Sequence, residues 1–206
     1  RPQPGAVEIP IDLQYKIVDS EIVGTREVPL LVPDESLLEK AALQLSKAER
    51  PIIWAGGGVN ISDGAEALTA LAERLGAPVM TTIEGRGSIA EDHDLSLGFC
   101  SDRPAMAEAF EEADLVLAVG TRFQNYATKV WTLPLPDHLI HIDADAGVIN
   151  RNYQSSLPIV GDARLSLEGI LERLTSSSVD NQFVERLKKW KGADQAELLN
   201  EIGPDH

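Results

Sequence analysis

The feature that most restricts the fold of this sequence is a series of short apolar runs separated by segments with helical spacing. The apolar runs cover residues 52–55, 78–82, 115–119, 139–142 and 157–160. Runs of this kind, without alternating polar residues, are typical of strands buried on both faces of a parallel sheet. We therefore expect a sheet built mainly from these five segments.

Between the runs, apolar residues recur at helical spacing. One such segment follows the cap candidates Asp34 and Ser36, and a second runs from Ser62 to the helix-ending residues Gly76 and Pro78. Others lie at residues 106–113, 162–174 and 183–190. The alternation predicts right-handed crossovers in an α/β fold: a doubly wound, Rossmann-like parallel sheet in three α/β/α layers.

The two ends of the chain do not follow this pattern. Residues 1–33 read as an extended strand at Val7–Ile11 followed by a linker, the main domain as residues 34–175, and residues 176–206 as a linker that begins with three serines. The first residue is Arg1 and no signal peptide follows it. We expect a piece of a longer chain.

Composition excludes several classes of function. The net charge of −15 argues against nucleic acid or an anionic membrane as a partner, because both attract basic surfaces. A single cysteine, Cys100, fits a reducing cytoplasm, and no apolar run approaches the length of a membrane span. Aromatic residues make up only 5% of the chain, so we expect a core of Ala, Val, Ile and Leu.

Polar or glycine-containing loops follow the strands, and in a parallel sheet such loops share the carboxyl edge, where ligands bind. They are Gly56-Gly57-Gly58, Thr81-Thr82, Gly120 to Phe123, Asp143 to Asp145, and Gly161-Asp162. Glycines let backbone N–H groups approach a phosphate, although a single such loop can equally just end a strand. Five at one edge together predict a nucleotide crevice.

Individual residues in these loops have two readings each. Arg122 could bind a phosphate or close a salt bridge with a carboxylate. Asp143 and Asp145 resemble a metal pair but lack a third ligand at clear spacing, so we favour a ribose or adenine contact for Asp143. His141 lies within an apolar run, and we interpret it as a core histidine.

Complete catalytic motifs are not recognisable. The glycines do not form G-x-G-x-x-G, since position 61 is Ile, and Thr81-Thr82 stands where an NAD-binding strand would end in an acid. Walker A, H-E-x-x-H and nucleophile-elbow patterns are not found either. Neither a catalytic nor a metal-binding residue is predicted.

Four stretches together resemble one family. They are "RPIIWAGGGVNISDGAEALTALAERLGAPVMTTIEGRGSIAEDHDLSLGF", "EEADLVLAVGTRF", "LIHIDADAGVINRNY" and "IVGDARLSLEGIL". They are similar to the middle domain of thiamine-diphosphate-dependent enzymes such as acetolactate synthase, pyruvate oxidase, glyoxylate carboligase and benzoylformate decarboxylase. The opening "PGAVEIPIDLQ" resembles the last strand of the preceding pyrimidine-binding domain.

The resemblance implies about six strands and a parent enzyme that uses thiamine diphosphate and Mg²⁺ on a 2-oxoacid. The activating glutamate and the G-D-G motif of such enzymes belong to other domains, so this chain alone should be inactive. It implies partners in the other domains of the parent chain and a homodimer or homotetramer.

In acetolactate synthase-like members the middle domain carries FAD, and other members hold ADP or coenzyme A there, or nothing. The candidate residues for FAD or ADP are Gly56, Gly57, Gly58, Thr82, Arg122, Asp143 and Asp162. The stretches "FCSDRPAMAE" and "QNYATKVW" depart from the flavin-binding pattern. Two alternatives stay open: a purely structural domain, and an NAD-binding domain of the deacetylase or deoxyhypusine-synthase type.

Overall fold

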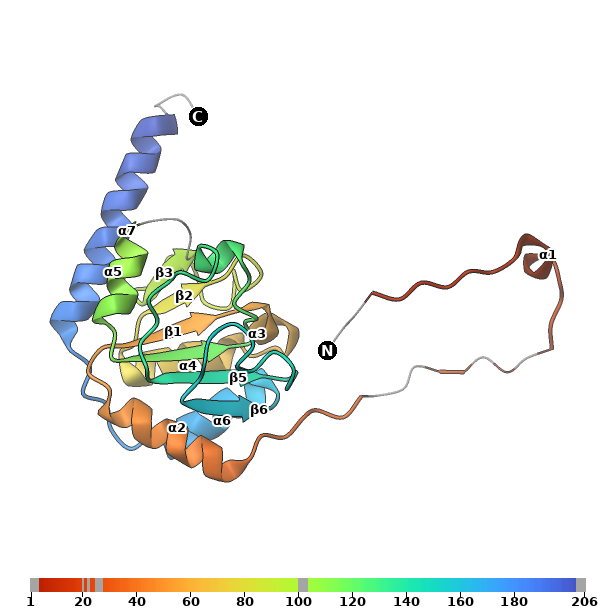
Figure 1. The fold of residues 1–206 in the computed structure, drawn as a ribbon, viewed down its shortest axis with the longest axis horizontal. Coiled ribbons are helices and arrows are strands. Elements are labelled where there is room, and N and C mark those ends of the chain that lie inside the picture. The colour runs from red at the N-terminus through yellow and green to blue at the C-terminus, as the bar shows by residue number, and fades with distance from the viewer. Residues whose placement is uncertain (1–3, 20, 22, 25–27, 100–103, 203–206) are drawn as a thin grey trace. The chain divides into compact units, whose positions relative to one another are not determined.

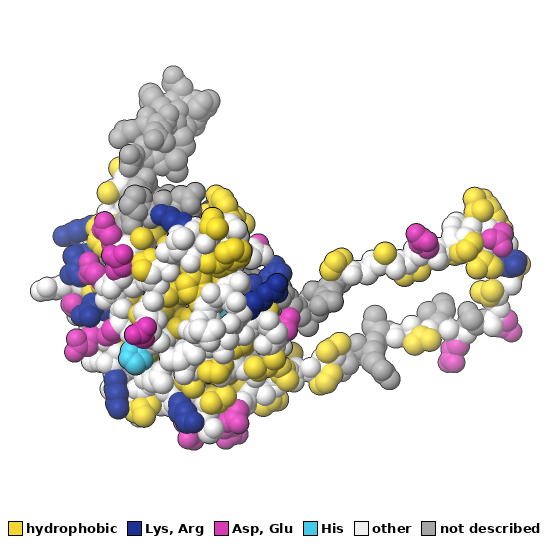
Figure 2. Space-filling model, viewed as in Figure 1, with side chains coloured by type: hydrophobic (Ala, Val, Ile, Leu, Met, Phe, Trp, Pro, Cys, Tyr) yellow, Lys and Arg dark blue, Asp and Glu magenta, His cyan; other side chains and the backbone are white. Residues whose placement is uncertain are grey.

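The chain divides into two units, Arg1–Leu30 and Leu31–His206. The computed structural model describes residues 4–19, 21, 23–24, 28–99 and 104–202. Within the described part of the first unit the regular element is α1 (Ile11–Gln14), and hydrophobic side chains are exposed along the segment (Figure 2). The strand expected at Val7–Ile11 is wrong, because residues 4–10 have no regular structure. An extended segment becomes a strand only where its N–H and C=O groups pair with a neighbour.

The second unit is built on a six-stranded parallel sheet (Figure 1). Its strand order is β3-β2-β1-β4-β5-β6. The strands are β1 (Pro51–Ala55), β2 (Val79–Thr81), β3 (Ser96–Phe99), β4 (Leu115–Val119), β5 (Leu139–Asp143) and β6 (Leu157–Val160). This confirms the predicted doubly wound parallel sheet. The strand order reverses between β1 and β4, which is where open α/β sheets bind ligands.

The sequence pattern missed β3. Its four residues include Gly98 at φ 76°, and the register against β2 shifts between Val79 and Met80. Such an interrupted segment gives no continuous apolar run. Lys191 fixes this edge strand from outside: its Nζ donates to the carbonyls of Ser96 and Glu91, both at 2.8 Å.

One face of the sheet is covered by α2 (Glu35–Lys47), α4 (Ala65–Leu75) and α6 (Ala163–Arg173). Their buried hydrophobic residues are Ala and Leu with Ile170, and they pack on the aliphatic side chains of the strands. Asp34 caps α2: its Oδ1 accepts from Ser36 Oγ at 2.7 Å and from Ser36 N at 2.8 Å. These two hydrogen bonds hold the pKa of Asp34 below its ordinary value. The predicted cap and apolar stripe of α2 are thus confirmed.

The opposite face carries α5 (Pro104–Glu112) and α7 (Asn181–Ile202) and is aromatic. Trp54 lies at its centre, 5.1 Å from the ring of Phe110 and 5.3 Å from that of Phe123. The expectation of a purely aliphatic core is therefore wrong for this face. Few aromatic residues suffice, because each fills a large volume and they are concentrated on one side of the sheet.

Helix boundaries differ from the prediction at two places. The glycine loop continues into a short helix, α3 (Gly57–Ile61), and α4 begins only at Ala65 with Gly64 as its cap. The last helix extends past Lys191, through the polar segment that was predicted to be a linker, to Ile202. Among the residues of this helix whose burial is described, the buried apolar ones are Phe183, Val184 and Leu187 in its first turns.

Candidate functional site

The predicted loops do lie together at the carboxyl edge of the sheet (Figure 1). Since β1 is flanked by β2 and β4, the loops that hold Gly56, Thr82 and Arg122 are neighbours at the point where the strand order reverses. Asp143 ends β5, and Asp162 follows β6. All seven predicted residues are therefore at one edge, spread over five neighbouring strands.

The glycine loop after β1 packs against the backbone of the loop after β4. The Gly56 N–H donates to Val119 O at 2.8 Å, and the Gly58 N–H donates to Gly120 O at 3.0 Å. A Cβ on Gly56 would lie 2.3 Å from Gly120 O, and one on Gly58 would lie 2.6 Å from Gly120 Cα. Any side chain at either position would collide with main chain. Two of the N–H groups that were expected to face a phosphate are thus already bonded within the protein.

The loop after β2 is held in the same way. Thr82 is buried; its N–H donates to Ala55 O at 2.9 Å, and its Oγ1 accepts from Gly85 N at 3.1 Å. Asn60 of α3 donates to the carbonyls of Glu84 and Arg86, both at 3.0 Å. Thr82 therefore shapes the loop and fixes its path across the end of β1.

Three exposed polar side chains span the loops after β2 and β4. The Gln124 amide fits between Glu84 and Arg122 with its nitrogen toward Glu84: it donates to Glu84 Oε1 at 3.2 Å and accepts from Arg122 Nη2 at 2.6 Å. The Arg122 backbone is fixed as well, because Asn152 Nδ2 donates to its carbonyl at 3.0 Å. Glu84 and Gln124 were not predicted, since an exposed acid and amide in loops carry no sequence signal until folding brings them together.

Further along, the loop after β4 has an unusual backbone. After the 3-10 helix η1 (Tyr126–Thr128), the residues Lys129, Val130 and Trp131 have φ of 48°, 59° and 59°. Such values cost energy for side-chain-bearing residues, most of all for a β-branched valine. The Trp131 indole N–H donates to Phe123 O at 2.8 Å and anchors this segment to the end of β4.

His141 connects the loop after β4 to β5. Its side chain is fully buried, and Nε2 donates to Thr121 O at 2.9 Å, with the Phe123 ring 4.8 Å away edge-on. Burial lowers the pKa of His141 below its ordinary value, because desolvation disfavours the imidazolium; the Thr121 hydrogen bond and the Asp143 charge act in the opposite direction. The side chain is a core histidine, as the sequence indicated.

Asp143, Asp145 and Asp162 each accept a hydrogen bond from the backbone a few residues further along the chain. Asp143 is buried and its Oδ1 accepts from Asp145 N at 2.9 Å, while Asp145 Oδ1 accepts from Gly147 N at 2.9 Å. Asp162 caps α6 by accepting from Leu165 N at 3.1 Å. Among the described residues there is no group of three His, Cys, Asp or Glu side chains that could hold a metal ion. Cys100 lies outside the described residues.

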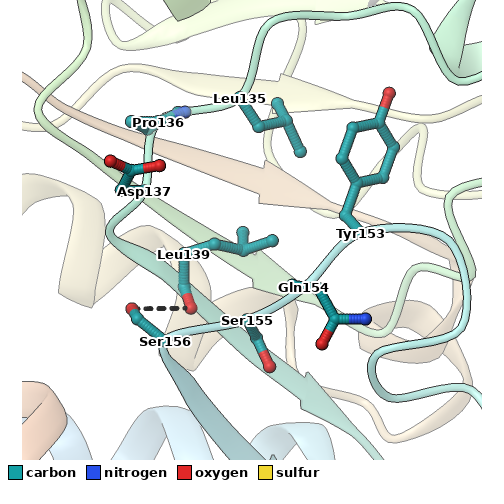
Figure 3. A pocket seen from close by; sticks show the side chains of 8 residues that line it. All are labelled: Leu135, Pro136, Asp137, Leu139, Tyr153, Gln154, Ser155 and Ser156. Carbon is teal, nitrogen blue, oxygen red and sulfur yellow. Dashed lines mark hydrogen bonds between the residues drawn. The ribbon is translucent and has the colours of Figure 1, made fainter.

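A separate pocket of about 370 Å³ lies at the amino edge of β5 and β6. Figure 3 shows Leu135, Leu139 and Tyr153 turned toward this space, and Ser156 Oγ donates to Leu139 O at 3.2 Å. Pro136, Asp137, Gln154 and Ser155 also line it. It contains none of the predicted site residues, and it lies at the edge opposite to the one where α/β sheets bind ligands.

The family model for the thiamine pyrophosphate enzyme central domain matches residues 38–170. The chain belongs to this family. It is 33% identical over 235 residues to the acetolactate synthase large subunit of Corynebacterium glutamicum, covering 100% of this chain and 37% of the relative. It is 39% identical over 185 residues to a probable 2-ketoarginine decarboxylase of Pseudomonas aeruginosa, covering 88% of this chain and 32% of the relative.

A solved structure leads to the same family. The X-ray structure of a protein from Mycobacterium smegmatis, described as a thiamin diphosphate-dependent enzyme, superposes with a TM-score of 0.63 at 26% identity. The superposition covers 75% of this chain and 30% of that one. The chain spans about a third of the length of the curated relatives it matches. It is a central domain related to that of acetolactate synthase. Among its described residues, no helix is long and apolar enough to cross a membrane.

Proposed function

We propose that this chain is the central domain of a 2-oxoacid carboligase or decarboxylase and that its carboxyl edge binds a nucleotide, FAD or ADP-like. The observation that carries the proposal is the position of Arg122. This exposed arginine lies in the loop after β4, three residues beyond the strand and beside the loop after β1, at the point where the strand order reverses. A fixed guanidinium at such a point suits a nucleotide phosphate.

The residues present fit a nucleotide in part. Arg122 would hold a phosphate, whereas the faces of Gly56 and Gly58 are already filled by the backbone of the loop after β4. Asp143 and Asp162 are at the same edge, but one oxygen of each already accepts a backbone N–H. A bound FAD or ADP would contribute binding energy and rigidity here, and we assign no chemical step to it.

Catalysis is assigned to other domains. In the proposed parent enzyme, thiamine diphosphate with Mg²⁺ supplies the carbanion chemistry that breaks the bond to the carboxylate of a 2-oxoacid. Among the described residues no group of three His, Cys, Asp or Glu side chains could hold a metal ion, and we propose that both groups bind to the other domains. Its partners would be the other domains of the parent and further copies in a homodimer or homotetramer, in the cytoplasm.

A scaffold without any ligand is the second candidate. It is favoured by one observation: the N–H groups of Gly56 and Gly58 are both satisfied by β4 and its loop. In this case the glycines serve only to bring two backbones together.

Calorimetric titration of the 206-residue chain with FAD and with ADP separates the two candidates. Binding that weakens at least tenfold in Arg122→Gln, while Arg173→Gln on the distant end of α6 leaves it unchanged, supports the nucleotide site. If neither ligand gives heat and neither raises the melting temperature, the scaffold is the correct function. In both cases we expect no turnover of pyruvate with added thiamine diphosphate and Mg²⁺; turnover above background would contradict the assignment of catalysis to other domains.

A further inference from the structure

Glu84 places a carboxylate at the turn where the proposed phosphate would lie. A Cβ built on Gly57 would be 2.8 Å from Glu84 Cβ, so the side chain of Glu84 starts directly beside the glycine turn. The loop has little freedom to carry it away, because Asn60 holds the carbonyls on either side of Gly85. Unlike the nearby Arg86, which pairs with Glu91 at 3.6 Å, Glu84 is directed toward the loop after β4.

The same carboxylate is coupled to Arg122. Gln124 lies between them, 3.2 Å from Glu84 Oε1 and 2.6 Å from Arg122 Nη2. Only the Gln124 amide therefore separates the Arg122 guanidinium from the negative charge of Glu84, and a phosphate bound to Arg122 would lie close to that charge. The attraction of the arginine is partly offset, and by an amount that grows with the charge on the phosphate.

We propose that Glu84 is a specificity-determining residue that disfavours a terminal phosphate. This inference rests on the proposed nucleotide site. At neutral pH a terminal phosphate carries nearly two charges, whereas each phosphate of a pyrophosphate diester carries one. With Glu84 in place, the site takes a dinucleotide, whose phosphates are both esterified, in preference to ADP.

The test is Glu84→Gln, which removes the charge and keeps an oxygen that can accept from Gln124. The matched control is Glu49→Gln, another exposed acid, which lies two residues before β1 at the amino edge of the sheet. Binding of ADP, FAD and adenosine to all three proteins is measured by calorimetry at low and at high salt.

We expect Glu84→Gln to bind ADP about fivefold more tightly than the wild type and FAD about twofold more tightly, with adenosine unchanged. Glu49→Gln should match the wild type, and the gain for ADP should shrink at high salt, because salt screens exposed charges. A merely structural role of Glu84 would change all three ligands alike.

The outcomes separate this inference from the proposal beneath it. If ADP binds equally well to the wild type and Glu84→Gln, Glu84 does not set specificity but the nucleotide site stands. If no nucleotide binds to any of the proteins, both ideas are wrong.

Discussion

The carboxyl edge of the sheet has two halves that are held together by different chemistry. In the glycine half, the loops after β1, β2 and β4 touch main chain to main chain through Gly56, Gly58, Gly85 and Gly120. In the carboxylate half, after β5 and β6, Asp143 and Asp162 accept backbone N–H groups and so define the next turn or helix. In the glycine half the close contact between backbones leaves no room for a Cβ atom, while in the carboxylate half aspartate oxygens supply hydrogen-bond acceptors.

This difference matters for reading function from such a sequence. A glycine that brings two backbones into contact is required whether or not a ligand binds nearby. The same is true of an aspartate that caps a helix. Arg122, Gln124 and Glu84 at this edge are exposed, and the Gln124 amide hydrogen-bonds to both of the other two side chains. Specificity is therefore to be sought in those three side chains.

The largest effect is expected from Gly120→Ala in the glycine half. Gly120 has φ 61°, and a Cβ there would lie 2.5 Å from Gly58 Cα, so the substitution combines backbone strain with a collision. We expect a loss of about 3 kcal/mol or more in the free energy of unfolding, measured by urea denaturation. Gly76→Ala is the control: φ is 72°, but nothing lies within 4 Å, and the loss should be about 1 kcal/mol. Equal losses would show that the contact between the loops is unimportant.

An intermediate effect concerns His141, which joins the two halves through its bond to Thr121 O. Because burial lowers the pKa of His141 in the folded protein, the unfolded chain binds more protons at acid pH. The stability contributed by this group is complete above its unfolded value of 6.5 and is lost as the pH falls below it.

The slope from this one residue is at most about 1.4 kcal/mol per pH unit. It is measured from urea denaturation between pH 8 and pH 5, about the range in which histidine changes its charge. His141→Asn should have a flatter profile, although it is less stable at every pH. A slope unaltered by His141→Asn would contradict the prediction.

The smallest effect is expected in the carboxylate half. Asp162→Ala removes the cap of α6 and should lower the free energy of unfolding by about 1 kcal/mol. Asp162→Asn keeps an acceptor and should recover most of that loss in thermal unfolding. If both variants bind nucleotide as the wild type does, Asp162 is a cap and not a ligand residue. A tenfold loss of affinity in the stable Asp162→Asn variant would instead assign it a direct contact.

How far the sequence predicts this protein depends on whether neighbours in the chain or neighbours in space decide a feature. Five strands are predicted by short apolar runs, and the cap Asp34 by its position before a segment with helical spacing. β3 is not predicted, because a glycine and a shifted register interrupt the strand and leave no continuous apolar run. The strand expected at Val7–Ile11 fails for the complementary reason: its pattern is right for a strand, but no partner strand pairs with it within the described residues.

The sequence alone determined the layers, the parallel sheet and the edge at which the loops gather, because burial on both faces and strand–helix alternation are local patterns. Only the tertiary structure decided what those loops do at that edge. In the folded protein Gly56 and Gly58 pack against Gly120, and their N–H groups donate to backbone carbonyls of the same chain. The Gln124 amide joins Glu84 to Arg122. These contacts join residues far apart in the chain, and no local propensity encodes a distance between two loops.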